Sequence, residues 1–317
     1  MQAVLNAALP IFALILLGWV CGHRRILPQG ATDSLNGFVV WLALPAVLFQ
    51  AMATITRAEI GQPGFFIAMV GGIVGTFGLA FLLDRRQPRT LVDTSIEGLG
   101  ACYANAGFMG LPLCLAVFGP EGLPPAVLAM LLTACVLFAC TIAMIELGLQ
   151  QGSSPWRTLG RVAWQLARNP LVAAPALGLA WSVTGLALPL PVLRFTTLLG
   201  ASASPCALVT IGLFLARPQA TQARPGLADP RTTWRLVGLK LLVQPAITGV
   251  LALLVFRMPP LWAHAAVLLS ALPIGTGPFM LAKLYEREAG TMSRAILFST
   301  LLSVLTVSGL VAWMGPS

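Results

Sequence analysis

Long apolar runs alternate with short polar stretches along the whole chain. A helix needs roughly 20 residues to cross about 30 Å of hydrocarbon, so the pattern predicts ten transmembrane helices. The protein is therefore expected to be an all-α polytopic membrane protein. The expected ranges are 3–22, 34–54, 64–83, 95–118, 123–148, 170–187, 191–216, 233–256, 261–284 and 292–314. The gaps between them are short, which leaves no room for a soluble domain.

Composition supports this class. Hydrophobic residues make up 57% of the chain and charged residues 9%, whereas a soluble domain carries about 25% charged residues. The mean hydropathy is +0.87. These values exclude an ordinary soluble protein.

The charges are distributed unevenly between the loops that join the predicted helices. If the loops are numbered 1 to 9, fifteen of the 19 Lys and Arg residues fall in odd loops, and even loops hold only Arg57, Arg194 and Arg257. Basic loops stay in the cytoplasm, so both termini are predicted to lie outside. The net charge of +9 therefore indicates topology, and no nucleic-acid partner is expected.

The N-terminal apolar run is expected to remain in the mature protein. No basic residue precedes it, and Arg24 and Arg25 follow it, which is the reverse of the order in a signal peptide. The six cysteines include no C-x-x-C pair, so no structural metal site is predicted. No cofactor is expected either.

The two halves of the chain are predicted to form an inverted repeat. Five helices precede loop 5 and five follow it, so the second half would insert upside down relative to the first. The repeats would be residues 1–150 and 151–317. Four pairs of prolines recur at intervals of 160 or 161 residues: Pro10 and Pro170, Pro45 and Pro205, Pro28 and Pro189, and Pro112 and Pro273.

Two of the predicted helices contain residues that disfavour a helix near their middle. The fourth contains NAGFMGLPLC (105–114) and the ninth ALPIGTGPFM (271–280). Proline and glycine allow the backbone to unwind, and freed backbone groups in hydrocarbon need partners. Half-helix N-termini also favour an anion. The alternative is a pair of packing kinks. The candidate substrate-binding residues are Asn105, Gly107, Pro112, Pro273, Gly275, Thr276, Gly277 and Pro278.

Few ionisable residues lie inside the predicted helices. Lys240 either extends to the interface or offsets a carboxylate of the substrate. Glu97, Glu146 and His264 are candidates for coupling to protons, with a solvated or capped helix end as the alternative for each. Sodium coupling through unwound carbonyls and Thr276 is the other possibility, so H⁺ and Na⁺ both stay open. Tyr103 is expected to serve packing.

Four stretches carry a resemblance to a known family: LNGFVVWLALPAVLF (35–49), N-x-G-F-M-G-L-P-L from Asn105 to Leu113, LKLLVQPAI (239–247) and ALPIGTGPFMLAKLY (271–285). Together they resemble the auxin efflux carrier (AEC, PIN-like) family. The resemblance implies ten helices in two inverted repeats, with helices 4 and 9 broken where they cross. It also implies a scaffold of helices 1, 2, 6 and 7, often dimeric. Helices 3–5 and 8–10 would move as an elevator.

The resemblance also indicates a substrate class. Bacterial members of the family are assigned to malonate and related dicarboxylates, and plant relatives export auxin. Loop 5 has only about 20 residues and lacks the long cytosolic loop of many plant relatives. This favours the short bacterial type, a multi-pass protein of the inner membrane.

The sequence thus predicts a secondary transporter of small organic anions. No enzymatic activity is expected, because no G-x-S-x-G or H-E-x-x-H motif is present. The expected partners are the anion, the lipid bilayer and a second copy of the chain. The alternatives are a sodium-coupled symporter of the bile-acid type, a membrane sensor and an intramembrane enzyme.

Overall fold

The structure is a computed structural model that describes residues 2–28, 30–56, 61–83, 90–149, 160, 164, 168–216 and 230–314. These residues form helices and connecting loops, with one isolated antiparallel bridge. Six helical stretches among them are long and apolar enough to cross a membrane, and three shorter helices are also apolar. The polytopic helical class expected from the sequence is confirmed.

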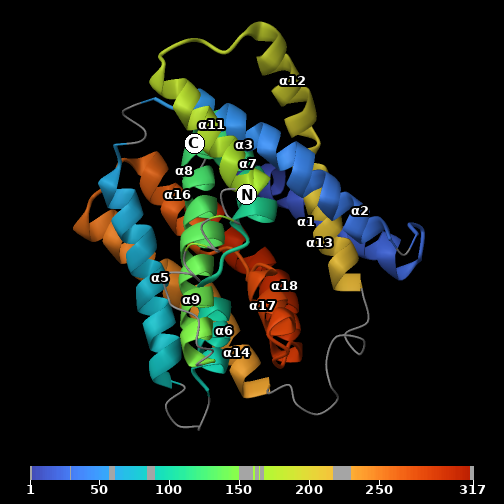
Figure 1. The fold of residues 1–317 in the computed structure, drawn as a ribbon, viewed down its shortest axis with the longest axis vertical. Helices are drawn as coiled ribbons and strands as arrows, with labels where there is room; N and C mark the ends of the chain where they lie inside the picture. The colour runs from blue at the N-terminus through green and yellow to red at the C-terminus, as the bar shows by residue number, and fades with distance from the viewer. Residues whose placement is uncertain are drawn as a thin grey trace.

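The first half of the chain contains eight helices that are labelled in Figure 1. Three of the junctions are π-helical, at Val39–Ala43, Ala106–Gly110 and Leu132–Leu137. The bounds are α1 Gln2–His23, α2 Ala31–Phe38, α3 Leu44–Ala53, α5 Pro63–Leu83, α6 Leu91–Cys102, α7 Leu111–Phe118, α8 Leu123–Leu131 and α9 Phe138–Gly148.

The second half contains a similar succession of helices. Two π-helical segments, Leu239–Val243 and Val250–Val255, flank α15. The bounds are α11 Pro170–Val183, α12 Leu190–Ala201, α13 Ala203–Ala216, α14 Pro230–Gly238, α15 Gln244–Gly249, α16 Pro260–Ser270, α17 Gly277–Leu284 and α18 Gly290–Met314.

Both predicted interruptions are present. The fourth predicted helix stops at Cys102 and resumes at Ala106, and the ninth stops at Ser270 and resumes at Gly277. Pro112 lies in the first turn of α7, beyond the interruption, whereas Pro273 lies inside the other one. The interval of 161 residues between these two prolines therefore does not join equivalent positions. The predicted helix 191–216 is also divided, at Ser202.

Two close helix contacts are related by an interval of 160 residues. A Cβ atom added to Gly18 of α1 would lie 2.2 Å from the carbonyl oxygen of Val209 in α13, and one added to Gly178 of α11 would lie 2.3 Å from that of Phe49 in α3. Gly178 and Val209 each follow their counterparts, Gly18 and Phe49, by 160 residues. Glycine is needed at both positions because a side chain would overlap the facing backbone.

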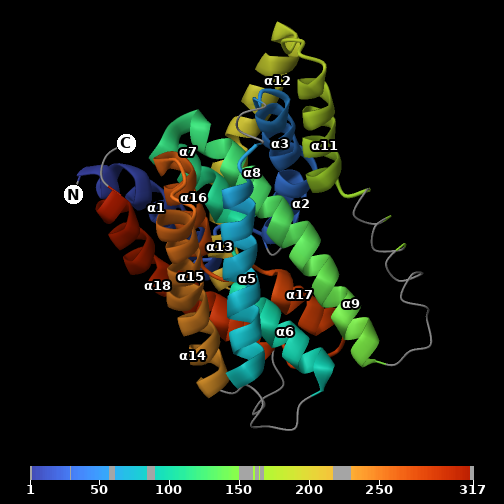
Figure 2. The same ribbon diagram turned by 90° about the vertical axis from the view of Figure 1, so that its left-hand side faces the viewer.

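The helix ends are sorted between two sides of the molecule. The C-terminal ends of α5 and α9 lie at the lower end of both views, together with the start of α14 (Figures 1 and 2). The first and last helices place the chain termini toward the opposite, upper part (Figure 2). Successive loops that alternate between the two sides of the membrane would produce this sorting. Which side is cytoplasmic stays a prediction from the charges.

Candidate functional site

The two interrupted segments lie against each other and exchange backbone hydrogen bonds. The N–H of Asn105 donates to the carbonyl of Pro273 (2.9 Å), and the N–H of Gly275 donates to the carbonyl of Tyr103 (3.0 Å). Ala104 and Ile274 thereby form a short antiparallel bridge. The prediction that two unwound segments meet is confirmed, and each supplies partners for backbone groups that the broken helix leaves free.

Side chains from neighbouring helices hold the second interruption. The N–H of Ile274 donates to Ser299 Oγ of α18 (3.1 Å). The ammonium of Lys240 donates to the carbonyl of Ser270, the last residue of α16. A cation at a helix C-terminus is favoured because unpaired carbonyls give that end a partial negative charge.

The glycines of the second interruption make room for an aromatic ring. A Cβ atom on Gly275 would lie 2.9 Å from the ring of Tyr103, and one on Gly277 would lie 2.8 Å from it. The ring also packs against Phe138, with 6.1 Å between centroids. Tyr103 thus has the packing role expected of it, and it occupies the space beside two glycines that were expected to face a substrate.

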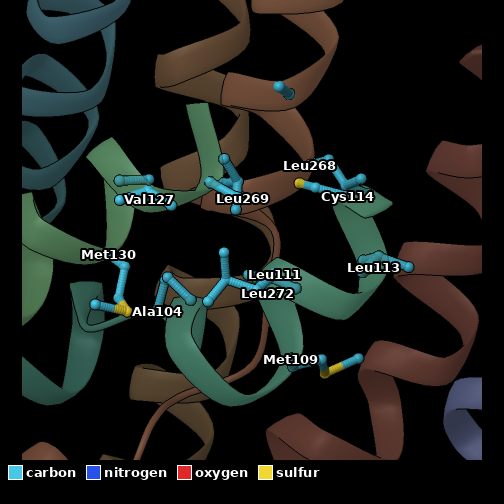
Figure 3. Packing of buried hydrophobic residues seen from close by; sticks show 14 of the residues in the cluster. Ala104, Met109, Leu111, Leu113, Cys114, Val127, Met130, Leu268, Leu269 and Leu272 are labelled. Atoms are coloured by element: carbon cyan, nitrogen blue, oxygen red, sulfur yellow. The ribbon is translucent and has the colours of Figure 1, made fainter. Parts of the chain in front are cut away.

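Two leucines of α16 and Leu272 of the second interruption pack in the hydrophobic core with residues of the first interruption. Figure 3 shows Leu268, Leu269 and Leu272 beside the turn that leads into α7. A Cβ atom on Gly110 would lie 2.9 Å from side-chain atoms of both Leu269 and Leu272. Gly110 therefore allows close packing between the two broken helices, which fixes the crossing within the hydrophobic core.

A partly polar cavity of about 240 Å³ lies on one side of the crossing. Asn105 and Thr276 contribute to it from the interruptions, Phe108 comes from the π-helical segment that follows Asn105, and the rest of its lining comes from α2, α13, α17 and α18. Asp33 is the one charged residue in this lining. The full lining is Thr32, Asp33, Asn36, Asn105, Phe108, Thr210, Ile211, Phe214, Thr276, Phe279, Met280, Ile296 and Thr300.

Asn105 and Thr276 hold equivalent places at this cavity. Asn105 immediately precedes the helical segment that continues into α7, and Thr276 immediately precedes α17. Among the described residues, neither side chain has a hydrogen-bond partner. Two helix N-termini and two available polar side chains therefore meet at one cavity, an arrangement that suits an anion.

A second cavity, of about 280 Å³, lies on the other side of the crossing. Gly107 and Pro112 line it together with residues of α3, α12 and α13, and Ser204 is the hydroxyl residue in the lining. The first cavity includes the start of α2 and the end of α13, while the second includes Leu123 at the start of α8. The crossing thus separates two cavities.

The remaining candidates lie away from both cavities. Lys240 is fully buried and does not extend to a surface. Glu97 pairs with Arg235 of α14 (2.6 Å), and Glu146 accepts a hydrogen bond from the Tyr285 hydroxyl (2.7 Å). His264 packs edge-on against Trp313, with centroids 5.8 Å apart. Pro273, Gly275, Gly277 and Pro278 are buried at the second interruption and do not line either cavity.

Several cavity residues were missed from the sequence. Asp33 lies just before the predicted range of the second helix, and Asn36 lies near the start of that range. Thr210 is a single polar residue in apolar surroundings, and Thr300 lies beside Ser299. A search for polar residues on predicted spans would have found Asn36, Thr210 and Thr300, but only the tertiary structure groups them with Asn105.

A helical membrane protein whose two broken helices cross beside polar and apolar cavities has the organisation of a membrane transporter. The family described as membrane transport protein matches residues 3–311, and the chain belongs to this family. It is therefore a membrane transport protein of the auxin efflux carrier type, as the sequence motifs predict.

Individual relatives support the assignment. A protein of Rhizobium meliloti (strain 1021), provisionally named a malonate transporter, is 30% identical over 312 residues, covering 98% of this chain and 96% of the relative. An uncharacterized transporter of Methanothermobacter thermautotrophicus is 25% identical and covers 95% of both chains. Auxin efflux carrier component 3a of Oryza sativa subsp. japonica is 27% identical, with 45% of this chain and 23% of the relative covered.

Proposed function

We propose that the protein is a secondary transporter of small organic anions, with a dicarboxylate such as malonate as substrate, and that the polar cavity beside Asn105 binds the anion. The observation that carries the proposal is the available carboxamide of Asn105, which faces this cavity beside Thr276 and two helix N-termini.

The size and chemistry of the cavity support a small anion. A cavity of about 240 Å³ lies below the usual range of about 300–1,000 Å³ for ligand sites, so it favours a short dicarboxylate over an indole. A hydrogen bond to a charged group contributes about 1.5–3 kcal/mol, and a helix N-terminus contributes about 0.3–2 kcal/mol. Two of each correspond to a Kd of roughly 2 mM to 50 nM before the entropic cost of association, which weakens the binding, is subtracted.

The cavities on the two sides of the crossing support alternating access. In an elevator mechanism, the third to fifth and the eighth to tenth of the ten predicted transmembrane helices would carry the crossing past a scaffold. The scaffold would consist of the first, second, sixth and seventh predicted helices. The anion would then leave the polar cavity toward the other side. Asn105 lines the polar cavity and Gly107 lines the other one, so the segment 105–107 borders both cavities, which supports this movement.

The proposed architecture is ten helices in two inverted repeats of five, residues 1–150 and 151–317. The contacts of Gly18 with Val209 and of Gly178 with Phe49, related by 160 residues, support it. We place the protein in a bacterial inner membrane because it resembles the short bacterial members of the family, and we place both termini outside because the basic residues lie in odd loops. The exposed apolar residues of α11 and α12, among them Leu177, Val183 and Leu198, suit a homodimer through the scaffold.

The relatives support malonate as the first substrate to test. The Rhizobium meliloti relative is named for malonate and aligns along almost its whole length. The test is exchange of radiolabelled malonate across proteoliposomes containing the wild type or Asn105→Ala. We expect saturable exchange by the wild type and at least a tenfold loss in the variant.

Other anions and ion gradients complete the test. Succinate and indole-3-acetate in place of malonate would separate a dicarboxylate carrier from an auxin-type carrier, and uptake under a sodium gradient would identify the sodium-coupled alternative. If wild-type vesicles exchange none of these anions, the proposal is wrong. If Asn105→Ala exchanges malonate at the wild-type rate, the binding site is misplaced.

A further inference from the structure

The side chain of Lys240 is enclosed in the protein interior. It belongs to the π-helical segment Leu239–Val243, it is 0% exposed, and its ammonium donates to the carbonyl of Ser270. Among the described residues it has no other hydrogen-bond partner and no carboxylate within salt-bridge distance. An isolated buried ammonium costs several kcal/mol, so the energy of this region depends on whether Lys240 carries a proton.

Polar residues continue from Lys240 along one face of its helix. Gln244 and Thr248 follow at intervals of four residues, and Thr76 lies on the adjoining helix α5. All three are 0% exposed, and their side-chain nitrogen and oxygen atoms have no hydrogen-bond partner among the described residues. Gly72 of α5 makes room for this row, because an added Cβ atom would lie 2.0 Å from Thr248 Oγ1.

The carboxylates of the helices around Lys240 are already paired with arginines. The segment Leu239–Val243 packs against α5, α6, α14, α15 and α18, and α5 and α15 contain no titratable residue. Glu97 of α6 pairs with Arg235 of α14, and Asp93 of α6 lies 3.8 Å from Arg287. The other titratable or charged residues of these helices are Cys102, Arg231 and Arg294, and α16, whose Ser270 accepts the hydrogen bond of Lys240, contains His264.

Lys240 is connected to the binding cavity through four residues of backbone. Its ammonium holds the carbonyl of Ser270, and the carbonyl of Pro273 three residues later accepts the N–H of Asn105. A charged ammonium holds the C-terminus of α16 more strongly than a neutral amine, because its charge opposes the helix dipole. Loss of the proton therefore weakens a contact that positions the crossing.

We propose that Lys240 binds the proton that is coupled to anion transport. In the loaded state one proton from water adds to the neutral amine and forms the ammonium, which offsets part of the anion charge. After the anion leaves, the same proton returns to water on the other side and the amine is again neutral. The polar row of Thr76, Gln244 and Thr248 supports hydration of this site. The inference rests on the proposed transport function and assigns coupling to a residue other than Glu97, Glu146 or His264.

The test compares two transport modes in proteoliposomes that contain the wild type, Lys240→Met or the control Arg194→Met, an exposed position on α12. Malonate exchange at equal pH reports binding and movement. Accumulation under a gradient of one pH unit reports coupling, and one coupled proton gives about tenfold accumulation. We expect Lys240→Met to exchange malonate more slowly than the wild type and to accumulate none, whereas Arg194→Met behaves as the wild type in both modes.

Lys240→Arg is the second variant, because arginine stays charged at all accessible pH values. It should also lose accumulation driven by the pH gradient. If Lys240→Met does not fold, Lys240→Arg alone tests whether Lys240 carries the coupled proton. Accumulation at the wild-type level by either folded variant would overturn the inference, as would wild-type exchange that no pH gradient can drive. These results would leave the proposed function intact. Absence of any anion exchange by the wild type would instead refute the proposed function and this inference together.

Discussion

The backbone N–H of Asn105 donates to the carbonyl of Pro273 across 2.9 Å, while Asn105 also lines the polar cavity and its carboxamide has no hydrogen-bond partner among the described residues. One residue thus has two separate roles, since its main chain joins the broken helices and its side chain remains available for a ligand. Changes to the side chain should therefore affect transport and spare the fold.

Replacement of Asn105 by alanine tests this separation. The variant keeps the backbone bond to Pro273, so we expect its melting temperature to stay within about 2 °C of the wild type, because interhelical side-chain bonds in membranes average about 0.6 kcal/mol. Its malonate exchange should fall at least tenfold, in line with the loss of a hydrogen bond to a charged group. Asn105→Gln should retain part of the activity. A large loss of stability in Asn105→Ala would contradict a purely ligand-binding side chain.

Asp33 introduces a negative charge into the lining of the same cavity. A carboxylate repels an anion, so Asp33→Asn should lower the KM for malonate several-fold at low ionic strength. The difference should shrink at about 0.5 M salt because the charge is screened. Initial exchange rates at two salt concentrations measure this. Asp33 has a role other than repulsion if the variant loses exchange at both concentrations.

Gly277→Ala is expected to disturb the crossing through Tyr103. The added Cβ atom would lie 2.8 Å from the ring, and overpacking of this kind costs about 1–3 kcal/mol. The melting temperature should fall by several degrees. Gly309→Ala is a matched control, because a Cβ atom there meets nothing within 4 Å.

A double variant identifies the cause of that loss. Tyr103→Leu removes most of the ring, so the cost of Gly277→Ala should become smaller when the two changes are combined. Melting curves of the two single variants and the double variant give the coupling energy. Additive effects would show that Gly277 is needed for a reason other than the ring.

Gly212→Ala is expected to separate α1 from α13. The added Cβ atom would lie 2.0 Å from the carbonyl oxygen of Ile15 and 2.5 Å from the backbone nitrogen of Trp19. Backbone atoms cannot rotate away as side chains do, so the helices must move apart. We expect a loss above about 3 kcal/mol and a sharply reduced yield of monodisperse protein. A yield equal to that of Gly309→Ala would contradict this tight contact.

Tyr285, which directly follows α17, predicts a response to alkaline pH. Partial burial and the hydrogen bond to Glu146 raise the pKa of its hydroxyl above the usual value. Because the folded pKa is raised, the stabilisation is complete below about pH 10, the unfolded value, and is lost as the pH rises through the folded pKa. Wild-type protein should therefore lose melting temperature above about pH 10 faster than Tyr285→Phe. Parallel curves for the two proteins would argue against this contribution.

The sequence by itself determined the class of the protein and the location of its breaks. Apolar runs of membrane-spanning length can be recognised without tertiary contacts, because the bilayer imposes the length of each helix. Asn105 lies inside the first interruption, and Pro273 and Gly275 lie inside the second, for a local reason, since proline and glycine disfavour a continuous helix. The family motifs are likewise readable along the chain.

Only the tertiary structure decided what each residue of the site contacts. In the folded protein, the ring of Tyr103 fills the space beside Gly275 and Gly277. Lys240 is buried and donates to the carbonyl of Ser270. Asp33 and Thr300 line the same cavity as Asn105. These residues are far apart in the chain and lie on different helices. Their proximity follows from the packing of the helices against one another, which depends on all the contacting side chains together and is not encoded by any local pattern.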